Sequence, residues 1–281
     1  LVVASETKDQ RDERRRYANT ASHESYALAL KALRDDLEID STSCVENGTQ
    51  MSLRDVAQFD GIVFAGSPIQ MHHVSDETRR AASFMRLVFD SGTPSFGSCA
   101  GLQIAAVAAG GATGPRQPGI EAALARNILT TDDGRDHPML AGRPPVWTAP
   151  AMHSSVVTTL PPGARVLARN ADTPVEAAEI RHGNGVFWGV QYHPEITLAE
   201  VAASLRRQAS DLVDAGLAAS IKAVEDHADR LQALSDDPAR TDLAWQLGVD
   251  DQVTDTANRM REIGNFLSAL EGDALRLPHG R

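Results

Sequence analysis

The pattern of apolar residues changes near residue 197. Upstream, short apolar runs typical of buried strands, such as 61–65, alternate with longer segments whose apolar residues recur at helical spacing, such as 78–90. This alternation predicts a mostly parallel sheet that is covered by helices on both faces. From Leu198 onward, helical spacing dominates and strand-like runs disappear. We therefore expect an α/β domain over 1–197 and an acidic helical extension over 198–281.

Charge and cysteine content exclude several classes of protein. The 281 residues carry a formal net charge of -11, and such a surface repels phosphate backbones, which argues against nucleic-acid binding. No apolar run approaches the roughly 20 residues that span a bilayer, and no basic-then-apolar leader opens the sequence. Cys44 and Cys99 form no Cys-x-x-Cys pair, which argues against a zinc ribbon or a disulfide scaffold and fits a reducing cytoplasm.

The sharpest local signal is a G-x-C-x-G turn, Gly97-Ser98-Cys99-Ala100-Gly101, between a short strand and a helix. In that context the motif is typical of a nucleophile elbow, in which glycines permit a tight turn. The helix dipole then favours the reactive thiolate of Cys99, and the backbone N–H of Ala100 points to where an oxyanion would form. Taken alone, the turn is about equally compatible with a small buried cysteine.

A second signal, Gln191-Tyr192-His193-Pro194-Glu195, follows the predicted strand 186–190. In extended backbone, side chains two residues apart lie on the same side, so Glu195 can orient the His193 imidazole. Pro194 stiffens this arrangement. A cysteine nucleophile needs a histidine brought in from elsewhere in the chain, so the two signals together predict cysteine-dependent catalysis.

Over about residues 1–197 the sequence resembles the class I, triad-type glutamine amidotransferases, which include the glutaminase part of GMP synthase. Three segments match in the family's order, and the last two are highly specific as a pair: 61–68 (GIVFAGSP), 94–103 (PSFGSCAGLQ) and 189–195 (GVQYHPE). The resemblance implies a flavodoxin-like domain, with its mostly parallel sheet and helices on both faces. The helical tail is appended to it.

The resemblance also implies the site residues. It assigns a catalytic triad to Cys99, His193 and Glu195 and substrate contact to Gln103. The oxyanion hole would use backbone N–H groups of Ala100 and of the turn formed by Gly66 and Ser67. A loop near the glutamine α-carbon, matched less specifically, would include His153, Ser154 and Ser155.

The family reaction is hydrolysis of glutamine to glutamate and ammonia, with no metal or cofactor, and with ammonia passed to an acceptor or to a separate synthetase subunit. The tail holds too few residues for an ATP-binding synthetase domain and has no glycine-rich phosphate loop. Two alternatives remain open: a γ-glutamyl amide hydrolase with the same triad, and a non-catalytic regulatory subunit. Ala100 stands where the family often has a larger residue, and this extra space mildly favours a larger leaving group.

Other polar residues are weaker candidates. Cys44 is expected to be inert packing. The adjacent His72 and His73 are expected to line a loop near the cleft rather than bind metal, and the charge run 11–16 is expected to be a solvated loop.

The tail presents an apolar stripe that must be buried against something. Docking onto its own domain and an interface with a partner or a second copy are about equally compatible with it. Since the triad is complete at Glu195, the tail is not expected to be needed for the chemistry. The stripe comprises Val201, Leu205, Leu212, Val224, Leu231, Leu243, Leu247, Ile263, Phe266 and Leu267.

Overall fold

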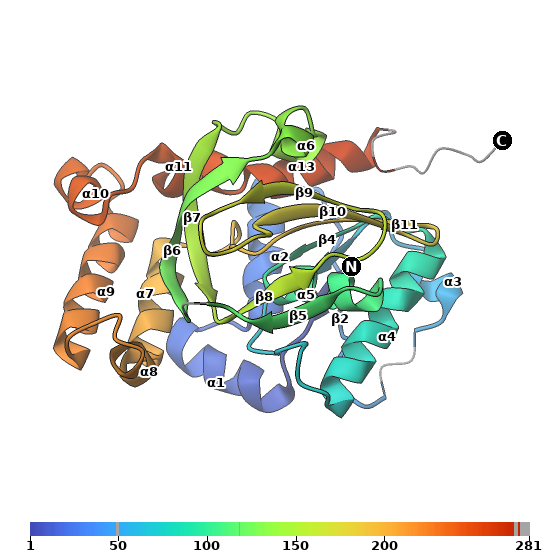
Figure 1. The fold of residues 1–281 in the computed structure, drawn as a ribbon, viewed down its shortest axis with the longest axis horizontal. Coiled ribbons are helices and arrows are strands. Elements are labelled where there is room, and N and C mark those ends of the chain that lie inside the picture. Colours follow the sequence, from blue (N-terminus) through green and yellow to red (C-terminus); the bar gives the residue numbers. More distant parts are fainter. Residues whose placement is uncertain (49–50, 118, 273–274, 276–281) are drawn as a thin grey trace.

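The computed structural model describes residues 1–48, 51–117, 119–272 and 275. Its main feature is a nine-stranded mixed sheet in the order β2-β1-β3-β4-β11-β10-β9-β6-β7 (Figure 1). The first five strands are parallel: β2 (Ser41–Ser43), β1 (Val2–Ala4), β3 (Ile62–Phe64), β4 (Ser95–Ser98) and β11 (Gly185–Val190). The other four are antiparallel: β10 (Ala177–His182), β9 (Ala164–Arg169), β6 (Glu121–Thr130) and β7 (Val146–His153).

The prediction of a mostly parallel sheet is therefore right for one half and wrong for the other. The antiparallel half follows from short connections between successive strands, such as the two-residue turn between β10 and β11, which cannot hold a crossover helix. A separate antiparallel pair consists of β5 (Ala112–Pro115) and β8 (Ser155–Thr159).

Helices before residue 197 cover the parallel half on both faces. They are α1 (Lys8–Ala18), α2 (Ser22–Leu33), α3 (Leu53–Val56), α4 (Asp76–Ser91) and α5 (Ala100–Ala108), with the short α6 (Asp132–Arg135) and 3-10 helix η1 (Pro138–Leu140) near the antiparallel strands. Strand residues alternate between two cores: Val2 and Val63 pack with α2, whereas Val3 and Phe64 pack with α4 and α5. This period of two is what burial on both faces of a sheet requires.

Helix α1 corrects the prediction of a solvated loop at 11–16. Thr7 and Gln10 form a capping box at its start, and Asn19, in the left-handed conformation at φ 62°, ends it. Arg15 forms ion pairs with Asp12 and Glu24. None of the helix residues is buried, so the segment lacks the apolar spacing by which sequence reasoning detects helices.

The tail forms seven helices in its described part and packs on the same chain. They are α7 (Leu198–Arg207), α8 (Ala209–Asp214), α9 (Ile221–Asp236), α10 (Thr241–Leu247), α11 (Asp251–Thr254), α12 (Thr256–Arg259) and α13 (Arg261–Leu270). Helices α7 to α11 share a core with Leu124 of β6, and all ten residues of the apolar stripe are buried. The stripe therefore supplies no exposed apolar surface for a partner or a second copy.

Helix α13 returns to the main sheet, while α9 and α10 lie at one end of the molecule (Figure 1). Phe266 packs against Phe96 and Trp188, with ring centroids 5.5 and 6.3 Å apart. Glu262 forms a buried ion pair with Arg143 at 2.6 Å and accepts a hydrogen bond from the Tyr192 hydroxyl at 2.8 Å. Because Tyr192 precedes His193, the tail supports the loop that carries the predicted triad, and we no longer expect it to be dispensable.

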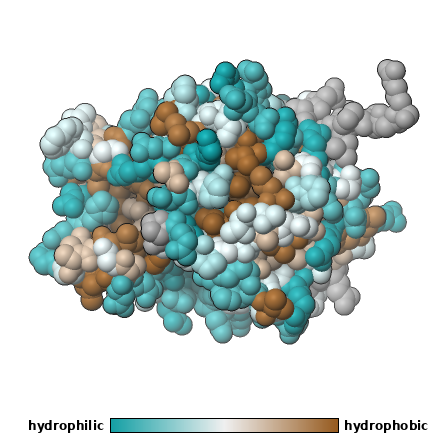
Figure 2. All heavy atoms as spheres, in the orientation of Figure 1, coloured by the Kyte–Doolittle hydropathy of each residue, from teal (hydrophilic) through white to brown (hydrophobic). Residues whose placement is uncertain are grey.

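On the face shown in Figure 2, hydrophilic residues predominate and hydrophobic ones form smaller areas. In the described part of the chain, every helix is too short or too polar to cross a bilayer.

We expect Phe266→Ala to lower the free energy of unfolding by about 3–5 kcal/mol, because it opens a cavity between α13 and the sheet. The matched control is Trp245→Ala, which removes an aromatic ring that is 84% exposed on α10 and should change stability by less than about 0.5 kcal/mol. Urea unfolding of both variants measures the difference. Equal losses would show that α13 does not contribute to the core as described.

Candidate active site

The predicted nucleophile lies at the carboxyl edge of the parallel strands, where α/β proteins place their ligands. Cys99 connects β4 to α5 with φ 51° and ψ -103°, a strained conformation for a residue with a Cβ. Its backbone N–H donates to Val190 O of β11 at 2.8 Å. A Cβ at Gly101 would lie 2.9 Å from Phe64 O, and one at Gly97 would lie 3.0 Å from the Gly101 Cα. The two glycines are thus needed for close packing of the strand and helix around the turn.

His193 and Glu195 follow β11 and lie together as predicted. The His193 Nδ1 and Glu195 Oε1 atoms are 2.7 Å apart, and both side chains are largely buried. The His193 backbone N–H donates to Pro150 O of β7 at 2.7 Å, which ties this loop to the antiparallel half of the sheet. With Nδ1 hydrogen-bonded to the carboxylate, Nε2 is the ring nitrogen left to exchange protons.

The surroundings of His193 favour its charged form. Burial lowers the pKa of the imidazole, but the negative charges of Glu195 and of the Cys99 thiolate, with hydrogen bonds to both, outweigh burial and raise it to about 10. An imidazolium beside a thiolate can both activate the sulfur and donate a proton to a leaving nitrogen.

The predicted oxyanion residues adjoin this pair. A Cβ at Gly66 would lie 2.5 Å from His193 Cε1 and 3.5 Å from Cys99 Cβ, so only glycine fits beside the imidazole. Gly66 and Ser67 line the pocket. Ala100, the first residue of α5, is buried and does not line the pocket. The extra space expected at Ala100 is therefore not part of the cavity.

The four predicted substrate contacts, Gln103, His153, Ser154 and Ser155, all line the same pocket, and the side chain of each also contacts other residues of the chain. The Gln103 amide donates to Ser155 O at 2.8 Å and to Gln191 Oε1 at 3.2 Å. The His153 Nε2 atom lies 2.9 Å from a Glu121 carboxylate oxygen, and the Nδ1 atom lies 3.2 Å from Ser155 O. These contacts shape the pocket wall and hold the loop at Ser154 and Ser155.

The pocket has a volume of about 370 Å³ and extends well beyond the predicted triad. Helix α1 contributes Gln10, Glu13, Arg14 and Tyr17, and the facing wall comes from α7 and α8 through Ala203, Ser204, Arg207, Gln208 and Asp211. Ion pairs cross between these walls: Arg207 lies 3.6 Å from Glu13, and Arg14 lies 3.4 Å from Glu200. We call this part of the pocket the outer chamber.

Sequence reasoning missed three contributors. Glu6 lines the pocket and accepts hydrogen bonds from the Ser22 N–H and hydroxyl, both at 2.9 Å. Arg116 and Glu121 lie behind His153, and only pairing across distant strands brings them there. Glu121 and His153 are direct partners of β6 and β7.

The structure also shows the surroundings of the weaker candidates, Cys44 and His72. Cys44 is buried, and burial raises the pKa of its thiol to about 12, as inert packing requires. His72 Nδ1 lies 3.2 Å from Ser155 Oγ, beside the pocket as expected. Among the described residues, no three histidine, cysteine or acidic side chains are grouped as metal ligands.

Comparison with known proteins identifies sequence relatives. The model of the family "Glutamine amidotransferase class-I" matches residues 22–209. A γ-glutamyl-L-1-hydroxyisopropylamide hydrolase from Pseudomonas sp. is 33% identical over 276 residues, 96% of this chain and 92% of that protein. The glutamine-hydrolyzing GMP synthase subunit from Ignicoccus hospitalis is 32% identical over 146 residues, 52% of this chain and 72% of that protein.

Solved structures with little sequence identity share the fold. A glutamine amidotransferase from Thermotoga maritima matches with a TM-score of 0.60 and 11% identity, covering 96% of each chain. A glutamine amidotransferase from Methylobacillus flagellatus matches with a TM-score of 0.57 and 15% identity, covering 100% of this chain and 96% of the other.

Proposed function

The chain belongs to the class I glutamine amidotransferase family, and from this premise we propose that it hydrolyses the amide bond of a small γ-glutamyl amide to glutamate and a free amine. The observation that carries the proposal is the outer chamber, which gives the pocket room for more than glutamine. The similarity to a named γ-glutamyl amide hydrolase over nearly the full chain supports it.

In the proposed mechanism, the Cys99 thiolate attacks the γ-carbonyl carbon and the carbonyl oxygen becomes an oxyanion near the N–H groups of Ala100 and the turn at Gly66 and Ser67. The His193 imidazolium donates its Nε2 proton to the amide nitrogen, the C–N bond breaks and the amine leaves. Water then gives a proton to His193 and attacks the thioester. The C–S bond breaks, glutamate leaves and the Cys99 thiolate returns.

We infer the orientation of the substrate in the pocket from the position of His193. Because the imidazolium protonates the leaving nitrogen, the amine lies on the His193 side of Cys99. Ile196 and then α7 follow His193 along the chain, and α7 lies near α1 (Figure 1). Side chains from both helices line the outer chamber. The glutamyl half then lies toward Gln103, Ser154 and Ser155. The outer chamber is thus the proposed site for the substituent on the amine.

A second candidate is hydrolysis of glutamine itself, with ammonia passed to an acceptor or a separate synthetase subunit. The similarity to the GMP synthase subunit of Ignicoccus hospitalis over about half of the chain favours it. A non-catalytic regulatory subunit is the third candidate, which the arrangement of Cys99, His193 and Glu195 disfavours.

We expect kcat/KM for a γ-glutamyl hydroxyalkylamide to exceed that for glutamine by about tenfold or more, because the outer chamber would contact a substituent that glutamine lacks, and about 1.4 kcal/mol from such contacts is enough. Glutamate release from both substrates provides the measurement. Ala203→Leu, which narrows the outer chamber, should reduce turnover of the hydroxyalkylamide and spare glutamine. Faster hydrolysis of glutamine would favour the second candidate, and turnover of neither substrate would favour the third.

A further inference from the structure

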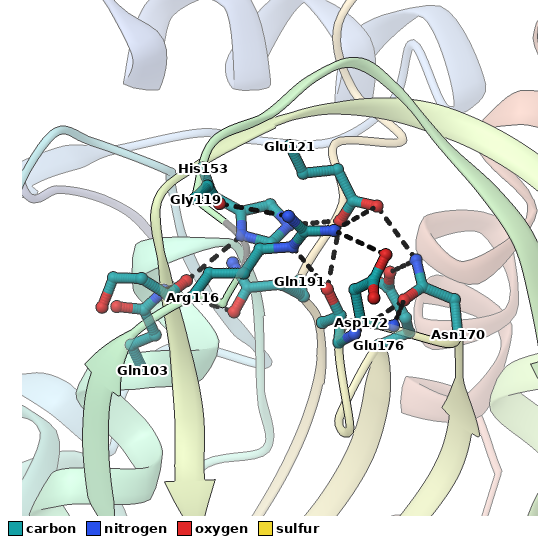
Figure 3. Close-up of polar contacts among 11 residues, drawn as sticks. Gln103, Arg116, Gly119, Glu121, His153, Asn170, Asp172, Glu176 and Gln191 are labelled. Atoms are coloured by element: carbon teal, nitrogen blue, oxygen red, sulfur yellow. Dashed lines mark hydrogen bonds and ion pairs between the residues drawn. The ribbon is translucent and has the colours of Figure 1, made fainter. Parts of the chain in front are cut away.

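A buried polar network lies beside Gln103 and His153, on the glutamyl side of the pocket (Figure 3). Its centre is Glu121, the first residue of β6, which is 9% exposed. Asn170 Nδ2 donates to Glu121 Oε1 at 3.0 Å, and Thr173 Oγ1 donates to Oε2 at 3.1 Å. Oε2 also lies 2.9 Å from His153 Nε2, and Arg116 Nη2 lies 3.4 Å from Oε1. Four side chains therefore hold this one carboxylate.

The network keeps Glu121 ionised at neutral pH. Burial alone would raise the pKa of the carboxyl group, but the hydrogen bond from His153 and the interactions with Arg116 and Asn170 favour the charged form, and the pKa is lowered. Burial lowers the pKa of His153, so the imidazole beside Glu121 is neutral near pH 7. A buried carboxylate in this state requires donors at both oxygens, which the four neighbours supply.

The carboxylate fixes the orientation of His153. A neutral imidazole carries one N–H, and the anionic acceptor at Nε2 attracts it. The Nδ1 atom, 3.2 Å from Ser155 O, then has no proton to donate, so the ring contacts Ser155 by packing alone, while Gln103 Nε2 donates to the same carbonyl at 2.8 Å. Ser155 is therefore packed between the ring that Glu121 orients and the amide of Gln103.

The same network holds the preceding residue through the backbone. The Arg116 N–H donates to Ser154 O at 2.8 Å. The Arg116 side chain donates to Thr173 Oγ1 at 3.2 Å and to Gly119 O at 3.1 Å, and it is only 6% exposed. Both residues of the pocket-lining turn, Ser154 and Ser155, are thus connected to Glu121 by short chains of contacts.

We propose that Glu121 is a positioning residue for the glutamyl half of the substrate, acting through His153 and Arg116 on the turn at Ser154 and Ser155. The proposal rests on the proposed γ-glutamyl specificity. Glu121 itself does not line the pocket. Its loss should therefore weaken binding of the glutamyl group without altering the reactivity of the Cys99 thiol.

The test is protection of Cys99 from iodoacetamide by L-glutamate, which reports on the glutamyl site without requiring turnover. In Glu121→Gln the half-protecting glutamate concentration should rise about tenfold, the usual effect of losing one charge-assisted hydrogen bond. The alkylation rate without glutamate should stay unchanged. For the hydrolysed substrate, KM should rise similarly while kcat changes by less than about twofold.

Glu179→Gln is the matched control. Glu179 is also a buried carboxylate paired with a histidine, with His137 Nε2 3.2 Å and Trp188 Nε1 3.0 Å from its Oε2 atom, but it does not line the pocket. This variant should lower the melting temperature and leave the half-protecting glutamate concentration unchanged. Thr173→Val removes one hydrogen bond to Glu121 and should raise the half-protecting glutamate concentration about threefold. This variant tests the proposal if Glu121→Gln does not fold.

Three results would overturn the proposal: no protection of the wild-type protein by glutamate, an unchanged half-protecting concentration in the folded Glu121→Gln or Thr173→Val protein, or an equal rise in Glu179→Gln. Failure of the proposed function has a different signature. If the wild-type protein hydrolyses no γ-glutamyl amide but Glu121→Gln still weakens protection by glutamate, the positioning role stands and the hydrolase assignment falls.

Discussion

Replacing Cys99 by alanine is expected to lower γ-glutamyl amide hydrolysis by about a thousandfold or more, because no covalent intermediate can form. The fold should persist, since the substitution removes a single sulfur atom from a pocket wall and alanine keeps the Cβ. The measurement is kcat/KM together with the melting temperature. Retention of even about a tenth of wild-type turnover would rule out Cys99 as the nucleophile.

Cys44 provides the matched control for this experiment. Its thiol is buried and its pKa is raised to about 12 by burial, so it stays protonated and unreactive near neutral pH. Cys44→Ala should retain full activity. A thiol-directed glutamine analogue should label Cys99 and spare Cys44, and equal labelling of the two residues would contradict the assignment.

The second large effect is expected at the base. His193→Ala should reduce kcat by about a hundredfold or more, because the imidazole transfers protons in both half-reactions. Glu195→Gln should reduce kcat by only about tenfold, since the glutamine side-chain carbonyl can still accept the hydrogen bond from Nδ1–H and keep the ring oriented. Steady-state kinetics of both variants decide the point. An unchanged kcat in His193→Ala would refute the proposed triad.

Glu195→Gln should also change the pH dependence of the reaction. Burial lowers the pKa of His193, and the Glu195 carboxylate is the strongest influence that raises it again, to about 10. The imidazolium that protonates the leaving group is lost as pH rises through this pKa. In Glu195→Gln the pKa falls, so the alkaline decline of kcat/KM should begin at a lower pH than in the wild-type protein. If the alkaline decline of kcat/KM begins at the same pH in Glu195→Gln and in the wild-type protein, His193 is not the titrating group.

Four of the five strands in the parallel half, β1, β3, β4 and β11, could be predicted from sequence because each lies in a short strand-like run between helical segments. Strand β2, with the sequence Ser-Thr-Ser, contains no apolar residue and gave no such signal. Strand β6 could not be predicted either. It contains Ala123 and Asn127 at positive φ, and its register with β7 shifts between Ala125 and Ile128. These irregularities break the alternation of apolar and polar residues on which strand prediction depends. Long-range pairing, rather than local propensity, forms this strand.

The same distinction applies to the site. Cys99, His193 and Glu195 stand in short motifs whose local geometry is set by glycine and proline, so residue patterns suffice to propose them. Glu121 stands in no motif. It meets His153 only because β6 and β7 pair in one register, 32 positions apart in sequence. Helix α1, which forms a wall of the outer chamber, is likewise invisible to apolar periodicity because none of its residues is buried.

The central claim is that a glutamyl group is carried on Cys99 as a thioester while the amine leaves. The direct measurement is acid quenching of the wild-type protein during turnover of a γ-glutamyl hydroxyalkylamide, followed by mass spectrometry of its peptides. The account predicts a mass increase of one glutamyl group on the peptide containing Cys99, absent from the peptide containing Cys44 and absent in Cys99→Ala. Turnover of the same substrate by the wild-type protein with no adduct under rapid quenching, or with the adduct on another residue, would contradict it.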